Sequence, residues 1–91
     1  MLMKIQILTP EEIIFDGEVS SITVPGLLGE FQMLENHASI VSTLESGTIK
    51  LENVSSSSNY NKLMNDGKYK TFTIKNGLLE FNNNKGIILC D

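Results

Sequence analysis

The only histidine of the chain, His37, lies close in sequence to two carboxylates, Glu30 and Glu35. Histidine and carboxylates are the residue types of general acid–base catalysis and of metal binding. A catalytic site requires a nucleophile and a base within hydrogen-bonding reach, and a metal site requires more nitrogen ligands or a tighter carboxylate cluster. One histidine with two separated carboxylates establishes neither arrangement. We therefore predict no catalytic residue, no metal site and no cofactor, and favour a loop histidine that hydrogen-bonds the backbone or a partner.

The other candidate for chemistry is Cys90, the only cysteine. A single cysteine excludes a disulfide within the chain, and one cysteine with one histidine argues against structural zinc. Cys90 ends an apolar segment, which predicts a core position. The spacing of Gly26, Gly29 and Gly47 is not that of a phosphate-binding loop.

Composition argues against further classes of function. The net charge is −4 and all seven basic residues are lysines. Nucleic-acid and phosphoryl-transfer sites favour the bidentate fork of arginine, so we expect no nucleic-acid partner. Met1 to Lys4 lead directly into an alternating segment, so we expect no signal or transit peptide. No apolar run approaches the ~20 residues that span a bilayer. We predict a soluble chain that reaches a membrane only by docking.

The elements that must position these residues are short strands. Apolar and polar residues alternate with period two in most segments, and turn residues recur every 8–12 residues or so, as in all-β sandwiches and barrels. We predict one domain over residues 1–91, a small β-sandwich of about nine or ten strands without helices. The predicted strands are 4–9, 12–15, 19–24, 30–33, 40–44, 48–54, 69–75, 78–81 and 87–90.

Several turns are predicted between these strands. Asp16-Gly17 closes the second strand, and Pro25-Gly26 predicts a type II turn. Asn76-Gly77 predicts a type I′ hairpin between its flanking strands, because that turn needs φ > 0 at both positions. A further turn is expected over 82–86. The segment 55–68, which begins with four serines, is predicted to be a long polar loop.

Four apolar residues follow the predicted turn at Pro25-Gly26, namely Leu27, Leu28, Phe31 and Met33. They fit a core or an interface patch equally well from the sequence alone. The residues themselves therefore indicate a small acidic all-β domain that binds partners.

A set of short motifs adds to this interpretation through its order and spacing. The motifs are Ile5-Gln6-Ile7-Leu8-Thr9-Pro10-Glu11, Ile14-Phe15-Asp16-Gly17, Ile22-Thr23-Val24-Pro25-Gly26, Gly29-Glu30-Phe31, His37-Ala38, Gly47-Thr48-Ile49, Phe72-Thr73-Ile74-Lys75-Asn76-Gly77-Leu78-Leu79-Glu80-Phe81 and Ile88-Leu89-Cys90-Asp91. Together they cover nearly the whole chain. They resemble the N-terminal β-sandwich domain of the epsilon subunit of F-type ATP synthase.

The resemblance implies a β-sandwich of about ten strands and a non-catalytic role. Such a subunit belongs to the central stalk of the alpha/beta/gamma/delta/epsilon F1 assembly. It docks on the gamma subunit and on the polar loops of the c ring, and it couples proton or sodium translocation to ATP synthesis. The resemblance places the chain peripherally at the cytoplasmic face of the bacterial membrane.

The same resemblance assigns candidate contact residues. The loop that faces the c ring in the family corresponds to Glu30, His37, Ala38 and Ser39. Leu27, Leu28 and Met33 are candidates for the gamma interface.

The chain also departs from the family pattern. Gln32 stands where glycine is common, Leu34-Glu35 where an aromatic–proline pair is common, and Ser39 where proline is common. These departures predict a less rigid docking loop. The chain ends where the family usually begins a C-terminal helical hairpin, so we expect no hairpin-based inhibition and no ATP binding. The alternative function is a free-standing β-sandwich module that binds a peptide or small ligand.

Overall fold

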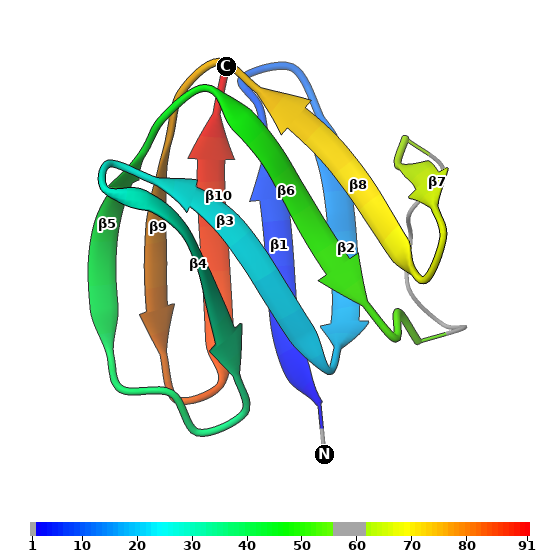
Figure 1. Cartoon of the computed structure of the whole chain (residues 1–91), viewed down its shortest axis with the longest axis vertical. Coiled ribbons are helices and arrows are strands. Elements are labelled where there is room, and N and C mark those ends of the chain that lie inside the picture. The colour runs from blue at the N-terminus through cyan, green and yellow to red at the C-terminus, as the bar shows by residue number, and fades with distance from the viewer. Residues whose placement is uncertain (1, 56–61) are drawn as a thin grey trace.

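The computed structural model describes residues 2–55 and 62–91 (Figure 1). Ten strands and no helix occur in these ranges, which confirms the all-β prediction. The strands are β1 (Met3–Leu8), β2 (Ile13–Val19), β3 (Ser21–Gly26), β4 (Gly29–Leu34), β5 (Ile40–Leu44), β6 (Gly47–Glu52), β7 (Met64–Asp66), β8 (Tyr69–Ile74), β9 (Gly77–Asn82) and β10 (Lys85–Cys90).

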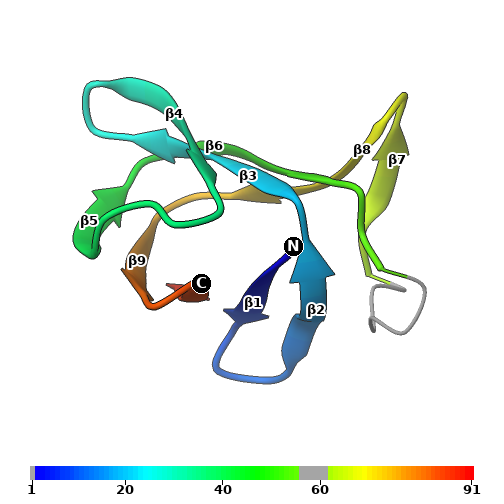
Figure 2. The same cartoon turned by 90° about the horizontal axis from the view of Figure 1, so that it is seen from below.

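The strands form one curled sheet that folds into two facing layers (Figure 2). The first layer has the order β2-β1-β10-β9-β5, and the second has the order β3-β6-β8-β7, with β4 beside β3. The layers join where Gly26 of β3 pairs with Leu44 of β5. The first and last strands, β1 and β10, pair in parallel in the middle of the first layer. The first and last strands thus lie side by side in one layer.

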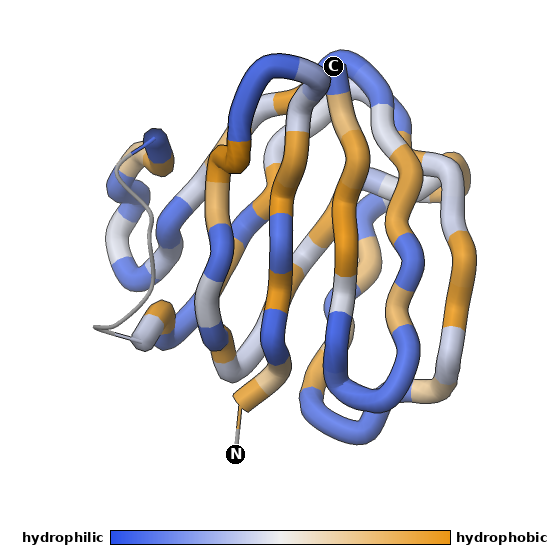
Figure 3. The backbone as a smooth tube through the Cα atoms, turned by 180° about the vertical axis from the view of Figure 1, so that it is seen from behind, coloured by the Kyte–Doolittle hydropathy of each residue, from blue (hydrophilic) through white to orange (hydrophobic). Residues whose placement is uncertain are grey.

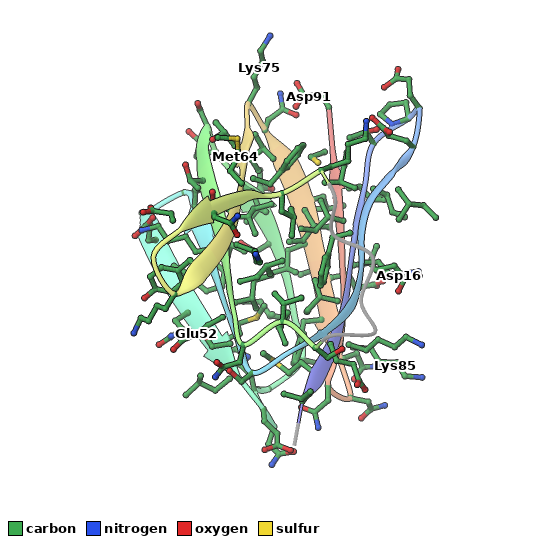
Figure 4. All side chains as sticks on the ribbon, turned by 90° about the vertical axis from the view of Figure 1, so that its right-hand side faces the viewer. Asp16, Glu52, Met64, Lys75, Lys85 and Asp91 are labelled. Atoms are coloured by element: carbon green, nitrogen blue, oxygen red, sulfur yellow. The ribbon has the colours of Figure 1, made fainter. Side chains whose placement is uncertain are left out.

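The core lies between the layers, where Figure 4 shows side chains from both sides filling the interior. Alternation explains its composition, because successive side chains of a strand point to opposite faces. Ile5 and Ile7 of β1 point inward as predicted, as do Ile49 and Leu51 of β6. The buried apolar residues are Met3, Ile5, Ile7, Ile14, Phe15, Val19, Ile22, Val24, Met33, Leu44, Ile49, Leu51, Ile74, Leu79, Phe81, Ile88 and Cys90.

Two predicted turns are wrong, because their residues lie within strands. Asp16 and Gly17 continue β2 and pair with Gln6 and Ile5 of β1. Pro25 and Gly26 end β3, and the turn follows them at 27–28. Gly26 pairs with Gly29, whose φ is +116°, so the two leucines make the connection. The predicted strand 19–24 accordingly divides, with residue 19 ending β2 and residue 21 starting β3.

The predicted hairpin at Asn76-Gly77 is also wrong. Neither residue has a positive φ, and the strands that flank them, β8 and β9, lie in different layers. The two-residue hairpin lies instead between β9 and β10, where Asn83 and Asn84 have φ of 53° and 59°. Positive φ at both central positions is the requirement of a type I′ turn. Asn-Gly marks a change of direction correctly, but layer packing decides which strands pair.

The predicted polar loop at 55–68 contains a short strand. Met64–Asp66 form β7, which pairs antiparallel with β8 through a turn that includes Gly67 at φ 62°. Ser55 at the start of the segment donates its backbone N–H to the carbonyl of Glu18. Residues 56–61, which include most of the serine run, lie outside the described residues.

Candidate partner-binding surfaces

His37 lies in the exposed loop that connects β4 to β5. Its backbone N–H donates to the carbonyl of Leu34 at 3.2 Å. Its Nδ1 lies 2.7 Å from the carbonyl oxygen of Ala38, so Nδ1 carries the proton and donates. The ring also meets Phe81 edge to face, with centroids 6.1 Å apart. In the neutral ring, Nε2 is therefore the acceptor that a partner would meet.

Side-chain hydrogen bonds tie this loop to the β9–β10 hairpin. The backbone N–H of Asn36 donates to Oδ1 of Asn84 at 2.6 Å, and Nδ2 of Asn84 donates to Oδ1 of Asn36 at 3.1 Å. Beyond His37, Oγ of Ser39 donates to Oδ1 of Asn82 at 2.7 Å. The sequence indicated a less rigid loop and did not predict these ties.

Glu30 does not lie in the His37 loop. It stands near the start of β4, pairs with Pro25 of β3, and forms an ion pair with Lys50 of β6 at 3.4 Å. Four residues of strand, about 13 Å, separate Glu30 from the end of β4 at Leu34. The acid–base pair considered for Glu30 and His37 is therefore not assembled. Among the described residues, no group of three or more His, Cys, Asp or Glu could hold a metal ion.

The exposed residues of β4 nevertheless connect the two positions along one strand. Glu30, Gln32 and Leu34 alternate with Phe31 and Met33 and are all exposed. We call these three residues and His37 the β4 stripe. The outer face beside the stripe, on β3 and β6, carries Thr23, Lys50 and Glu52, so it is polar and charged.

The three candidates for the gamma interface divide between surface and core. Leu27 and Leu28 form the tip of the β3–β4 hairpin, and Leu28 is fully exposed. Met33 is 0% exposed and belongs to the core, so its side chain presents no surface to a partner. The prediction for Met33 is corrected, because alternation along β4 points it inward with Phe31.

A larger apolar surface, which the sequence analysis missed, lies on the outside of the first layer. Strand register places its residues side by side: Leu8 pairs with Ile13 and Leu89, Leu89 pairs with Leu78, and Glu80 pairs with Ile87 and Val41. Val41 is 67% exposed and Leu89 is 50% exposed. We call this surface the apolar face; its apolar residues are Leu8, Ile13, Val41, Leu78, Ile87 and Leu89.

The apolar face has a shallow groove of about 340 Å³, lined by its residues except Ile13 and by Glu80. Within the part of the chain that the structure describes, Glu80 makes no ion pair. The sequence signal for this face is the unbroken apolar run from Ile87 to Cys90, which Figure 3 shows as a continuous hydrophobic segment of β10. Such runs are typical of strands covered on both faces.

The family model described as ATP synthase, Delta/Epsilon chain, beta-sandwich domain matches residues 2–91. The chain belongs to this family. The ATP synthase epsilon chain of Chlorobium limicola is 34% identical over 88 residues, which cover 97% of this chain and 88% of that protein. The epsilon chain of Nitratiruptor sp. is 36% identical over 89 residues, which cover 98% of this chain and 60% of that protein.

A solved structure has the same fold as this chain. The Euglena gracilis mitochondrial ATP synthase, OSCP/F1/c-ring in rotational state 1, contains a chain that matches with a TM-score of 0.75 and 21% identity. The match covers 98% of this chain and 50% of that one. Among the described residues, no helix is long and apolar enough to cross a membrane.

Cys90 lies in the core as predicted, and its thiol Sγ donates to the carbonyl of Leu8 at 3.5 Å. Burial raises the pKa of the Cys90 thiol above its ordinary value of 9.0, and the Asp91 carboxylate adds to the rise. Because the thiolate is the reactive form, we expect iodoacetamide at pH 8 to alkylate the native chain at least about tenfold more slowly than the urea-unfolded chain. Equal rates would contradict the burial of this thiol.

The same pKa shift predicts a pH dependence of stability. The unfolded chain releases the Cys90 proton near pH 9.0, before the folded chain does. The contribution of the thiol to the free energy of unfolding is therefore fully present below pH 9.0 and is lost as the pH rises through the folded pKa. Urea titrations between pH 8 and 10.5 should show this loss in the wild type and a smaller one in Cys90→Ala.

Proposed function

We propose that this chain is a non-catalytic rotor subunit of an F-type ATP synthase, docked on the gamma subunit and the c ring. Its membership of the family supports this role. The structural observation that carries it is the contrast between the two outer faces, one apolar and one polar, of a single folded sheet. A stiff sandwich with two unlike interfaces is what transfer of torque between two partners requires.

The apolar face is the surface we assign to the gamma subunit. Its residues span the first layer from Ile13 of β2 to Val41 of β5, and contiguous apolar surface of this kind marks interaction sites on soluble proteins. Glu80 stands among these side chains as a carboxylate. We therefore infer that gamma presents an apolar segment that carries a lysine or arginine opposite Glu80, because charge complementarity selects the partner and its register.

The β4 stripe and its loop are the surface we assign to the c ring. His37, Ala38 and Ser39 are exposed in the loop, and Glu30 is exposed at the far end of the strand. Contacts between polar loops depend on placed charges and hydrogen-bond donors more than on apolar area. A ring of polar loops that lies along β4 would meet Glu30 and His37 at separate points. Leu27 and Leu28, next to Glu30, remain a proposed edge of the gamma contact.

The location follows from these partners. We propose that the chain sits peripherally at the cytoplasmic face of the bacterial membrane, held there by the complex. The coupled ion, proton or sodium, is carried by the ring and not by this chain.

The test of the ring assignment uses the immobilised chain with purified c ring and purified gamma from the same source. Glu30→Ala and His37→Ala are each expected to reduce c-ring capture about tenfold, since a charge-assisted hydrogen bond lost at an interface is worth about 1.5–3 kcal/mol. Both variants should capture gamma as the wild type does.

Glu11→Ala, in the exposed connection between β1 and β2, is the matched control and should change neither binding. Loss of gamma capture with Glu30→Ala or His37→Ala would contradict the division of the two faces. If the wild type captured neither partner, a free-standing binding module would become the better interpretation.

A further inference from the structure

The run Asn82-Asn83-Asn84 is not explained by the turn it forms. A type I′ turn needs two residues with positive φ, and Asn83 and Asn84 supply them. Asparagine tolerates this conformation, but glycine adopts it with less strain. The Asn84 side chain does something more than turn formation, because both polar atoms of its amide bond to Asn36, 48 positions earlier in the sequence.

Two sets of hydrogen bonds to the β9–β10 hairpin hold the loop around His37, one before the histidine and one after it. Asn36, itself at φ 68°, is held by Asn84 immediately before His37. Ser39 is held by Asn82 two residues after His37. We call Asn36, Ser39, Asn82 and Asn84 the asparagine clasp. Only His37 and Ala38 lie between its two ties, so the exposed part of the loop is short and anchored at each end.

The hairpin that holds the loop is itself part of the first layer. The carbonyl of Asn84 accepts a hydrogen bond from the backbone N–H of Lys4, at 2.9 Å. Phe81, on β9 one residue before Asn82, is buried in the core and contacts the His37 ring. The clasp therefore connects the loop, which passes from β4 of the second layer to β5 of the first, to the β9–β10 hairpin of the first layer.

We propose that Asn84 is a positioning residue for the c-ring contact, a role that rests on the proposed function. Through Asn36 it fixes the backbone before His37, so that Nε2 is presented in one direction before the ring arrives. Ordering a loop at the moment of binding reduces affinity, and a loop that is already ordered avoids this loss. The loop sequence contains no proline that would restrict its backbone. The hydrogen bonds of the clasp supply the order instead, from the neighbouring hairpin.

The experiment compares two glycine variants of the same turn. Asn84→Gly keeps the positive φ and removes the amide that holds Asn36. Asn83→Gly keeps the positive φ at the adjacent position, where no tie to the loop is made. Asn83→Gly is expected to keep a Tm close to that of the wild type, because glycine suits this turn. Asn84→Gly is expected to lose a few degrees of Tm with its two hydrogen bonds to Asn36 and to remain folded at 25 °C. Binding measured at that temperature compares two folded chains, so a difference between them reports the clasp.

Three readouts are measured on each variant. Asn84→Gly should reduce c-ring capture about tenfold and leave gamma capture unchanged, and the ¹H–¹³C NMR signals of the His37 ring should move toward averaged positions. Asn83→Gly should match the wild type in all three measurements. Asn84→Asp retains the acceptor for the Asn36 N–H but loses the donor, so its c-ring capture should lie between those of Asn84→Gly and the wild type.

The proposal is wrong if Asn84→Gly keeps wild-type capture and wild-type His37 signals, or if Asn83→Gly loses capture to the same extent. It is also wrong if capture falls while the His37 signals do not change. If the wild type did not capture the c ring at all, the proposed function would fail by itself. The His37 signals of the two glycine variants would still decide whether Asn84 positions the loop.

Discussion

Replacing Leu89 by aspartate is expected to weaken capture of the gamma subunit at least about thirtyfold, the loss typical of an interface residue that contributes 2 kcal/mol or more. Leu89 lies in the middle of the apolar face, paired with Leu8 on one side and Leu78 on the other. A carboxylate there would be buried without a partner when gamma binds, which adds to the loss. The side chain is 50% exposed in the free chain, so folding should be retained.

The matched control is Met64→Asp, which places the same carboxylate on an exposed apolar residue of β7, 70% exposed and outside both assigned surfaces. It should change gamma capture less than threefold. Both variants should capture the c ring as the wild type does and should show an unchanged Tm. The opposite result, with Met64→Asp abolishing capture and Leu89→Asp neutral, would contradict the assignment of the gamma interface to the apolar face.

Replacing Phe15 by alanine is expected to remove about 3–5 kcal/mol from the free energy of unfolding, as for other buried phenylalanines. Phe15 is fully buried in β2 and pairs with Ile7 of β1. The whole free energy of unfolding of a native protein is about 5–15 kcal/mol, and this chain has only 91 residues. Much of the variant population should therefore be unfolded at 37 °C.

Urea denaturation followed by circular dichroism measures this loss. Leu34→Ala is the control, because that leucine is exposed on β4, and it should cost under about 1 kcal/mol. A loss for Phe15→Ala as small as that of the control would mean that the space between the layers is not filled as described.

Much of the fold could be predicted because burial on one face imposes a period of two. The strand Ile40–Leu44 has the bounds that alternation predicted, and Ile5 and Ile7 point inward as expected. The turns were less predictable. Asp16-Gly17 has turn composition but lies within β2, because Gln6 and Ile5 of β1 pair with these two residues. Local turn chemistry does not state which strands will lie side by side.

The candidate site was predictable in part for the same reason. The exposed loop around His37 was expected from its polar sequence, but the position of Glu30 at the far end of β4 depends on where the turn falls. Met33 was ambiguous until the phase of β4 was known. The apolar face was missed because residues 87–90 are all apolar. No alternation of apolar and polar residues therefore marks Ile87 and Leu89 as pointing outward. Only the register across β1, β10 and β9 shows that they form one surface.

The most direct test of two separate partner surfaces is sequential binding to the immobilised wild-type chain, followed by interferometry. Gamma is first added to saturation, and purified c ring is then added in its presence. We predict a second, saturable signal of the size that the ring produces alone, because the apolar face and the β4 stripe lie on different layers. Displacement of gamma by the ring, or no binding of either partner, would contradict the assignment of a rotor subunit with two interfaces.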